Sequence, residues 1–110
     1  MSELRLLPEV FDDTAQAVRW YEEQAYEGLG DRFLNVFYSY LQHIQEWGEA
    51  QRLVYGDFRR ILLYPFPYAL YYRYHGDWVV VSLVIHTARS PRLLRRLLNE
   101  RKLDRGTEPT

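Results

Sequence analysis

The stretch from residue 58 to residue 91, FRRILLYPFPYALYYRYHGDWVVVSLVIHTARSP, constrains the fold more than any other part of the chain. It contains two runs rich in β-branched and aromatic residues, which favour strands over helices. Gly76 and Asp77 separate these runs and predict a tight hairpin turn, because glycine accepts a positive φ. Pro65 and Pro67 cannot donate to a strand ladder, so they separate a further strand from the first run. The stretch therefore predicts three consecutive antiparallel strands, at residues 58–64, 68–74 and 79–85.

Alternation along these strands predicts two different faces of the sheet, since successive side chains point to opposite sides. We place the uniformly aliphatic set of the last strand against helices: Val79, Val81, Leu83 and Ile85. Ser82 and His86 then face the open side of the sheet. The more polar set of the middle strand is expected on that same side: Ala69, Tyr71 and Arg73. The sequence leaves the register open, so either Arg59 or Arg60 can join them.

One short strand and one helix are predicted at the start of the chain. Residues 3–7 form the strand, which ends at Pro8 because proline removes a backbone donor. Asp12 and Asp13 are candidate N-caps for a helix that begins near Thr14. Apolar residues then recur at helical spacing: Ala17, Val18, Trp20, Tyr21 and Ala25.

A second helix follows the break at residues 28–30, Gly-Leu-Gly, with Asp31 as its expected cap. It carries the clearest apolar stripe of the chain: Phe33, Phe37, Tyr40, Leu41, Ile44 and Trp47. Such a stripe is typical of a core-facing helix. The two helices are expected to form an antiparallel hairpin over one face of the sheet, and residues 49–56 a connecting loop.

The C-terminal part predicts a basic amphipathic helix that begins at Pro91. Its leucines share one side, Leu93, Leu94, Leu97 and Leu98, and its basic residues occupy the remaining surface. We expect this helix to contact a partner or to dock beside the sheet. Together the elements predict an α+β fold of βααβββ order, with an antiparallel meander sheet, a helical hairpin on one face and an optional short C-terminal helix. We expect a single domain at residues 1–103 and a flexible tail at 104–110.

Composition excludes several classes of protein. The 110 residues suit one domain, and the absence of cysteine rules out disulfides and thiolate metal sites. The three histidines show no zinc-ligand spacing, so we expect neither a metal nor a cofactor. No apolar run is long enough to span a membrane, and the N-terminus lacks the features of a signal peptide. We therefore expect a cytoplasmic protein with no membrane contact.

Charge is divided unevenly along the chain, although the net charge is only −1. Residues 1–56 carry four arginines against ten carboxylates, whereas residues 57–110 carry ten basic residues against five carboxylates. Such a division suggests an anionic partner for the basic half, either nucleic acid or an acidic protein segment. The alternative is that two solvated surfaces differ by chance.

The ordered motifs of this chain resemble those of the RelE/ParE superfamily of bacterial type II toxin–antitoxin toxins, and more narrowly its plasmid-stabilisation branch. The resemblance covers about nine tenths of the chain and rests on several stretches: Pro8 with Trp20-Tyr21-Glu22, Gly28 to Phe33, Arg59-Arg60, Phe66-Pro67-Tyr68, Tyr71-Tyr72-Arg73, and His86 with Arg89 and Pro91. It implies a growth-inhibiting toxin neutralised by a cognate antitoxin in a hetero-oligomer. Members of the family either inhibit DNA gyrase, as ParE does, or cleave messenger RNA at the ribosome, as RelE does.

Metal-independent RNA cleavage by 2′-OH attack needs a base, an acid and a cation to stabilise the charged transition state. His86 suits the role of base or acid, because its pKa normally lies near neutrality and it ends a strand. Arg89 and Arg60 are candidate phosphate clamps, and Tyr72, or its neighbour Tyr71, is a candidate acid or stacking platform. In the alternative interpretation, His86 bonds only to backbone and Arg60 pairs with a carboxylate. Further arginines are candidates for binding a partner or nucleic acid: Arg59, Arg73, Arg92, Arg95 and Arg96.

The chain departs from the pattern of the RelE-type nucleases along the second predicted strand, and this departure argues against RNA cleavage. Leu62, Leu63 and Tyr64 stand where the resemblance implies basic residues, and Lys102 is the only lysine. A ribosome-bound nuclease gains affinity from a strongly basic surface, which this chain lacks. We therefore expect ParE-like inhibition of DNA gyrase, with an mRNA endonuclease as the alternative and a non-toxic interaction module as the second alternative.

Overall fold

The computed structural model describes residues 2–102, so residue 103 and the tail predicted at 104–110 lie outside the described residues. The elements are β1 (Glu3–Leu6), α1 (Pro8–Glu22), α2 (Leu29–Trp47), the 3-10 turn η1 (Gly48–Ala50), β2 (Leu53–Tyr55), β3 (Phe58–Leu62), β4 (Tyr68–His75), β5 (Trp78–His86) and α3 (Pro91–Lys102). The predicted α+β fold is confirmed, with one strand added between the hairpin and the meander.

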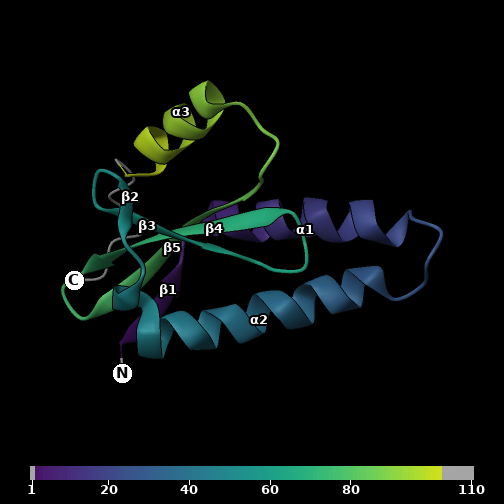
Figure 1. Cartoon of the computed structure of the whole chain (residues 1–110), viewed down its shortest axis with the longest axis horizontal. Coiled ribbons are helices and arrows are strands. Elements are labelled where there is room, and N and C mark those ends of the chain that lie inside the picture. Colours follow the sequence, from purple (N-terminus) through teal and green to yellow (C-terminus); the bar gives the residue numbers. More distant parts are fainter. Residues whose placement is uncertain (1, 103–110) are drawn as a thin grey trace.

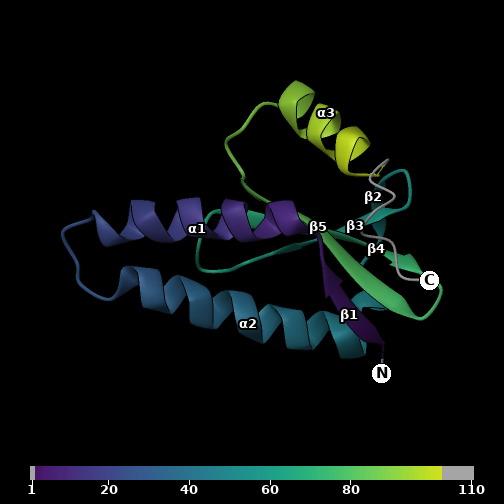
Figure 2. The same cartoon turned by 180° about the vertical axis from the view of Figure 1, so that it is seen from behind.

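The five strands form one sheet in the order β1-β5-β4-β3-β2. β3, β4 and β5 form the predicted antiparallel meander, whereas β1 pairs with β5 in parallel, which makes the sheet mixed. β2 was not predicted, because residues 49–56 were expected to form only a loop. The helices α1 and α2 lie on one face of the sheet and extend beyond its end, and α3 lies on the other face (Figure 1). The view from behind shows the same division into layers (Figure 2).

Helix α1 begins earlier than the sequence suggested. Pro8 occupies the first turn, where its fixed φ suits a helix and its missing N–H leaves no donor unsatisfied. The prediction of a start near Thr14 with Asp12 or Asp13 as N-cap was therefore wrong. Thr14 is buried within the helix, where its hydroxyl donates to the carbonyl of Val10 at 3.1 Å. Asp13 is thereby left for a different role.

Helix α2 begins at the break that the sequence indicated, but with a different cap. Gly28 is the N-cap residue with a φ of +83°, so the prediction of Asp31 as the cap was wrong. Gly30 allows α1 and α2 to approach closely, since an added Cβ would lie 2.7 Å from Cγ of Glu22 and 3.2 Å from Cγ1 of Val18. The predicted stripe is buried over most of its length, although Trp47 at its end is 61% exposed.

A β-bulge in β5 changes which side chains share a face. Tyr71 pairs with Leu83 and Tyr72 pairs with Val81, so Ser82 has no partner on β4. Alternation therefore inverts at Ser82. Val79 and Val81 pack under the hairpin as predicted, but Leu83 lies on the opposite face, in the core beneath α3. The prediction of one continuous aliphatic face was wrong for this reason.

The bulge also changes the face of the sheet on which the last side chains of β5 lie. Ile85 follows Leu83 and packs against the core beneath α3, although it was predicted against the helical hairpin. His86 pairs with Tyr68, and its ring lies 5.2 Å from the Tyr68 ring in an edge-on arrangement. Because Tyr68 packs against the hairpin core, His86 lies on the hairpin side rather than on the predicted open side.

Two hydrophobic cores result, one on each face of the sheet. The larger lies between the sheet and the α1–α2 hairpin, and its aromatic centre includes Phe33, Phe66 and Tyr72. The smaller lies under α3 and consists of Phe58, Ala69, Tyr71, Leu83 and Leu98. The C-terminal helix therefore packs against the sheet, which is one of the two alternatives expected for it. None of the helices within residues 2–102 has the length and apolarity that crossing a membrane requires.

Candidate functional site

Helix α3 is held to the domain at its C-terminal end. Leu98 is fully buried in the smaller core. Arg73 on β4 donates a hydrogen bond to the carbonyl oxygen of Lys102 at 3.3 Å. The ammonium group of Lys102 lies 4.0 Å from the carboxylate of Asp57, in the turn between β2 and β3. These contacts stabilise the last turn of α3 against the sheet.

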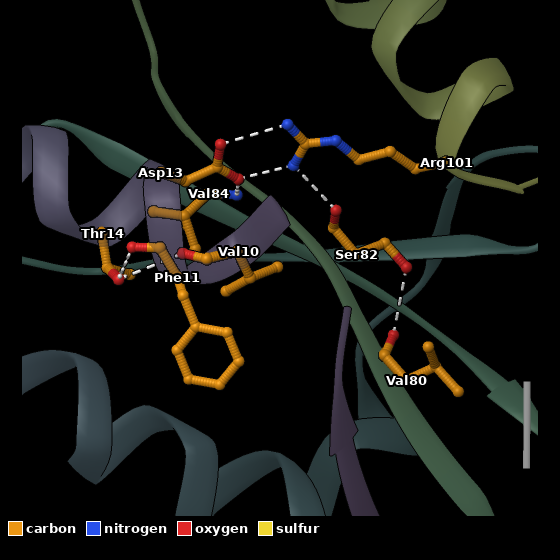
Figure 3. Close-up of polar contacts among 8 residues, drawn as sticks. All are labelled: Val10, Phe11, Asp13, Thr14, Val80, Ser82, Val84 and Arg101. Carbon is orange, nitrogen blue, oxygen red and sulfur yellow. Dashed lines mark hydrogen bonds and ion pairs between the residues drawn. The ribbon is translucent and has the colours of Figure 1, made fainter. Parts of the chain in front are cut away.

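A buried ion pair joins α3 to α1 (Figure 3). The guanidinium of Arg101 donates from both terminal nitrogens to the carboxylate of Asp13, with Nη2 at 3.1 Å from Oδ1. The two side chains are only 12% and 13% exposed. Asp13 also accepts the backbone N–H of Val84 at 3.0 Å, and Arg101 donates to the carbonyl of Ser82 at 3.0 Å. The pair thereby gives hydrogen-bond partners to backbone groups of Ser82 and Val84. Both residues lie beyond Val81, the last residue of β5 that pairs with β1.

Two clefts lie between the sheet and α3, and residues of the segment that joins β5 to α3 line both. The larger, which we call the α1 cleft, has a volume of about 420 Å³ and is lined by α1, the end of β5 and α3, with Trp20 and Tyr68 among its residues. The smaller, which we call the β3 cleft, has a volume of about 210 Å³ and is lined by Arg60, Tyr71 and Leu94 among others. His86 and Arg89 line both clefts.

One hydrogen bond determines which tautomer a neutral His86 ring adopts. Its Nδ1 accepts the backbone N–H of Ala88 at 3.0 Å, so a neutral ring carries its proton on Nε2. This bond agrees with the interpretation of His86 as a strand-end histidine bonded to backbone, and it leaves Nε2 for other contacts. Burial raises the pKa of the neighbouring Tyr68, while the charge of Arg89 opposes this shift. Tyr68 therefore stays a neutral hydrogen-bond donor near neutral pH.

Positive charge dominates the β3 cleft. Its lining includes Arg60, Arg89 and His86 but no carboxylate among the residues that the structure describes. Asp13 lines the α1 cleft, but its carboxylate is already engaged by Arg101. Within residues 2–102 neither Arg60 nor Arg89 forms an ion pair. The site therefore offers uncompensated cationic groups to an anion.

The structure brings together three of the four residues that the sequence suggested for catalysis. Arg60, His86 and Arg89 line the β3 cleft, and Arg60 rather than Arg59 lies on the side of α3, because it pairs with Tyr71. Tyr72 lies on the other face, where it is fully buried and its hydroxyl donates to the carbonyl of Gly48 at 2.7 Å. Burial raises the pKa of Tyr72 above that of an ordinary tyrosine. Tyr71 is the tyrosine that lines the cleft.

The five predicted binding arginines lie in different places. Arg59 donates to the carbonyl of Gln51 at 3.1 Å and lies 5.5 Å from the Tyr74 ring, away from the clefts. Arg73 is 9% exposed and lies 3.6 Å from Asp57. The remaining three are exposed on α3: Arg92, Arg95 and Arg96. Among these, Arg95 lines a cavity of about 150 Å³ that adjoins the β3 cleft through Arg60, Tyr71 and Leu94.

Sequence reasoning missed the residues that fix the position of α3. Asp13 and Arg101 are 88 positions apart, and neither belongs to a local motif. A basic residue in the last turn of the helix was visible, but its partner was assigned to a helix cap. Only the position of α1 against the end of β5 shows why an aspartate stands at position 13.

Comparison with known proteins supports the fold. No family model matches the sequence, and no curated protein matches it. Among solved structures, this chain is similar to a chain of the structure titled "Chromosomal ParDE TA system from P. aeruginosa", with a TM-score of 0.70 and 11% sequence identity. The alignment covers 78% of this chain and 96% of that chain. The likeness shows that this chain has a ParE/RelE-like fold.

Proposed function

We propose that the protein is the toxin of a bacterial type II toxin–antitoxin module and that a cognate antitoxin neutralises it by forming a hetero-oligomer with it. The observation that carries this proposal is the likeness of the fold to a chain of a ParDE TA system over 96% of that chain. The cationic cleft supports it, since it offers an anionic partner segment a place to bind. In this proposal the protein acts in the cytoplasm, inhibits growth when free, and stabilises the plasmid or chromosomal segment that encodes the pair.

We propose further that the toxin acts by binding a protein, DNA gyrase, rather than by cleaving RNA. The net charge of −1 gives the chain little general attraction to a phosphate backbone. Apolar side chains are exposed along and just after β3, with Leu62 49% and Tyr64 77% exposed. Exposed apolar and aromatic side chains of this kind are typical of protein–protein contacts.

Induced expression in bacteria tests this proposal. We expect growth arrest without the antitoxin and normal growth when a small acidic reading frame from immediately upstream is co-expressed. The mechanism predicts plasmid topoisomers of altered supercoiling and DNA-damage signalling, while transcripts remain whole. Expression that causes no growth defect, together with no adjacent antitoxin gene, would favour the non-toxic interaction module.

One specific observation favours the mRNA endonuclease as a second candidate. Arg60, His86 and Arg89 line a single cleft, so a base or acid and two phosphate-binding cations lie around one space. The His86→Ala variant tests this alternative. Rapid loss of transcripts on expression of the parent chain, abolished by His86→Ala, would establish RNA cleavage and refute gyrase inhibition. Arrest that persists in His86→Ala would remove this residue from the mechanism.

A further inference from the structure

The β3 cleft contains arginines that the rest of the described chain does not neutralise. On α3, Arg101 pairs with Asp13 and Arg96 lies 3.8 Å from Glu100, whereas Arg92 and Arg95 form no ion pair within residues 2–102. Arg60 and Arg89 likewise form no ion pair in the part of the chain that the structure describes, and these two line one cleft. They come from β3 and from the segment after β5, so the fold brings them to one cavity from distant positions.

The first turn of α3 adds to the positive potential of this cleft. Pro91, at the start of this 12-residue helix, lines the cleft. Ser90 accepts the N–H of Leu93 at 3.1 Å, which satisfies one donor of the helix N-terminus. The helix dipole places a partial positive charge at this end, which acts in the same direction as the two guanidinium groups.

Most of the remaining lining of the cleft is apolar, although Thr87 and Tyr71 also belong to it. Ile85 and Leu94 are half-buried and Ala69 is buried. A carboxylate with an aliphatic stem, followed by an apolar residue, matches such a lining better than a free ion does, because the apolar atoms contribute burial while the arginines contribute the charge.

We propose that the β3 cleft is a receptor for an acidic side chain of a partner protein, with the carboxylate between Arg60 and Arg89 and an adjacent apolar residue of the partner against Leu94. The inference rests on the proposed function only for the identity of the partner, since the cleft and its charges belong to this chain alone. The cleft volume of about 210 Å³ fits one or two side chains.

An RNA strand fits the same surface less well. Recognition of single-stranded RNA uses exposed aromatic rings on which bases stack, along a continuous cationic track. Tyr71, the tyrosine in the lining of the cleft, is only 3% exposed, and His86 is the other ring that lines it. The neighbouring β3 residue on the same face is Leu62, which supplies no charge.

Nuclear magnetic resonance titration of the full chain tests the proposal. The probe is a capped tripeptide with glutamate between two leucines, and the matched control peptide has glutamine in place of glutamate. We expect saturable shifts of the Nε–H signals of Arg60 and Arg89 with the first peptide and none with the second. Arg60→Gln and Arg89→Gln should each weaken binding about fivefold, as expected for an exposed charge-assisted pair.

Arg96→Gln is the control variant, because it removes the same charge from the exposed outer side of α3 and should leave the affinity unchanged. Arg60→Lys should restore part of the affinity that Arg60→Gln loses. The proposal is overturned if neither arginine signal responds to the glutamate peptide, if the glutamine peptide binds equally well, or if a short single-stranded RNA binds more tightly through the same signals. A chain that proves non-toxic but binds the peptide would refute only the proposed function.

Discussion

Replacing Asp13 with asparagine tests whether the buried ion pair between α1 and α3 stabilises the fold. The carboxylate accepts two hydrogen bonds from Arg101 and one from the N–H of Val84. The Asp13→Asn substitution keeps the size of the side chain but removes its charge. Arg101 would then remain a buried cation whose hydrogen bond to the carbonyl of Ser82 is unchanged but whose counter-charge is lost.

The expected loss of stability in Asp13→Asn follows from the burial of the ion pair. Removing one partner of a buried ion pair costs about 3–5 kcal/mol, because the remaining charge is left uncompensated. Both side chains keep slight exposure, 12% and 13%, so we expect a value at the lower end of this range. A loss of about 3 kcal/mol is a large fraction of the roughly 5–15 kcal/mol by which a domain is stable. It should lower the melting temperature by on the order of 10 °C.

Urea unfolding monitored by tryptophan fluorescence and circular dichroism measures this loss. Asp12→Asn is the matched control, because Asp12 is exposed on the same helix turn and its change should stay within about 0.5 kcal/mol. The double variant Asp13→Leu with Arg101→Met removes both charges and should be more stable than Asp13→Leu alone. If Asp13→Asn behaves like Asp12→Asn, or if the double variant shows simple additivity, the ion pair does not have the stabilising role that we assign to it.

Three further predictions concern the contact between β4 and the turn after α2. Tyr72→Phe removes the hydroxyl that donates to Gly48 and should lower the free energy of unfolding by about 1–2 kcal/mol in urea titrations. Gly48→Ala would place a Cβ 2.5 Å from the hydroxyl of Tyr74 and 3.2 Å from Cε2 of Tyr72, so thermal unfolding should show a loss of about 1–3 kcal/mol. Burial raises the pKa of Tyr72 above its ordinary value of 10.0, so the folded state retains a proton that the unfolded state releases. Stability should therefore be unaffected by this group below about pH 10 and fall as the pH rises further, and unfolding measured between about pH 8 and pH 11 should show a shallower fall in Tyr72→Phe.

The order of the elements was predictable because each leaves a local pattern in the sequence. The stripe of α2 has helical spacing, and Phe33, Phe37, Leu41 and Ile44 are buried as that spacing predicts. The meander was predictable because Gly76, which has a φ of +60°, connects two runs of strand-forming residues. Local signals of this kind do not depend on where the rest of the chain lies.

Features set by tertiary contacts were not predictable. Ser82 is an ordinary strand residue in the sequence, and the bulge is visible only in the pairing of β5 with β4. β2 is three residues long, and the edge position of this strand comes from its pairing with β3. The start of α1 was misjudged because Pro8 was taken only as the end of a strand, although proline also suits the first turn of a helix.

The candidate site was predictable in part. His86 and Arg89 were grouped by their closeness in sequence, and Arg60 was named without knowledge of its face. The register of β3 with β4 pairs Arg60 with Tyr71, which places Arg60 at the cleft. Tyr72 pairs with Arg59 and lies on the opposite face of the sheet, away from the cleft. The cleft itself depends on how α3 is placed, and that placement depends on contacts between residues far apart in the sequence.

The basic residues of α3 therefore form two groups with different roles. Arg101 and Lys102, in its last turn, have carboxylate neighbours at Asp13 and Asp57 and hold the helix to the domain. Arg92 and Arg95, nearer its start, form no ion pair within residues 2–102, and Arg95 lines the cavity that adjoins the β3 cleft. Because anchoring and exposed charge lie at opposite ends of the helix, an acidic partner can bind at the start of α3 without breaking the contacts that hold its end. Substitutions at the two ends should consequently separate stability from partner binding.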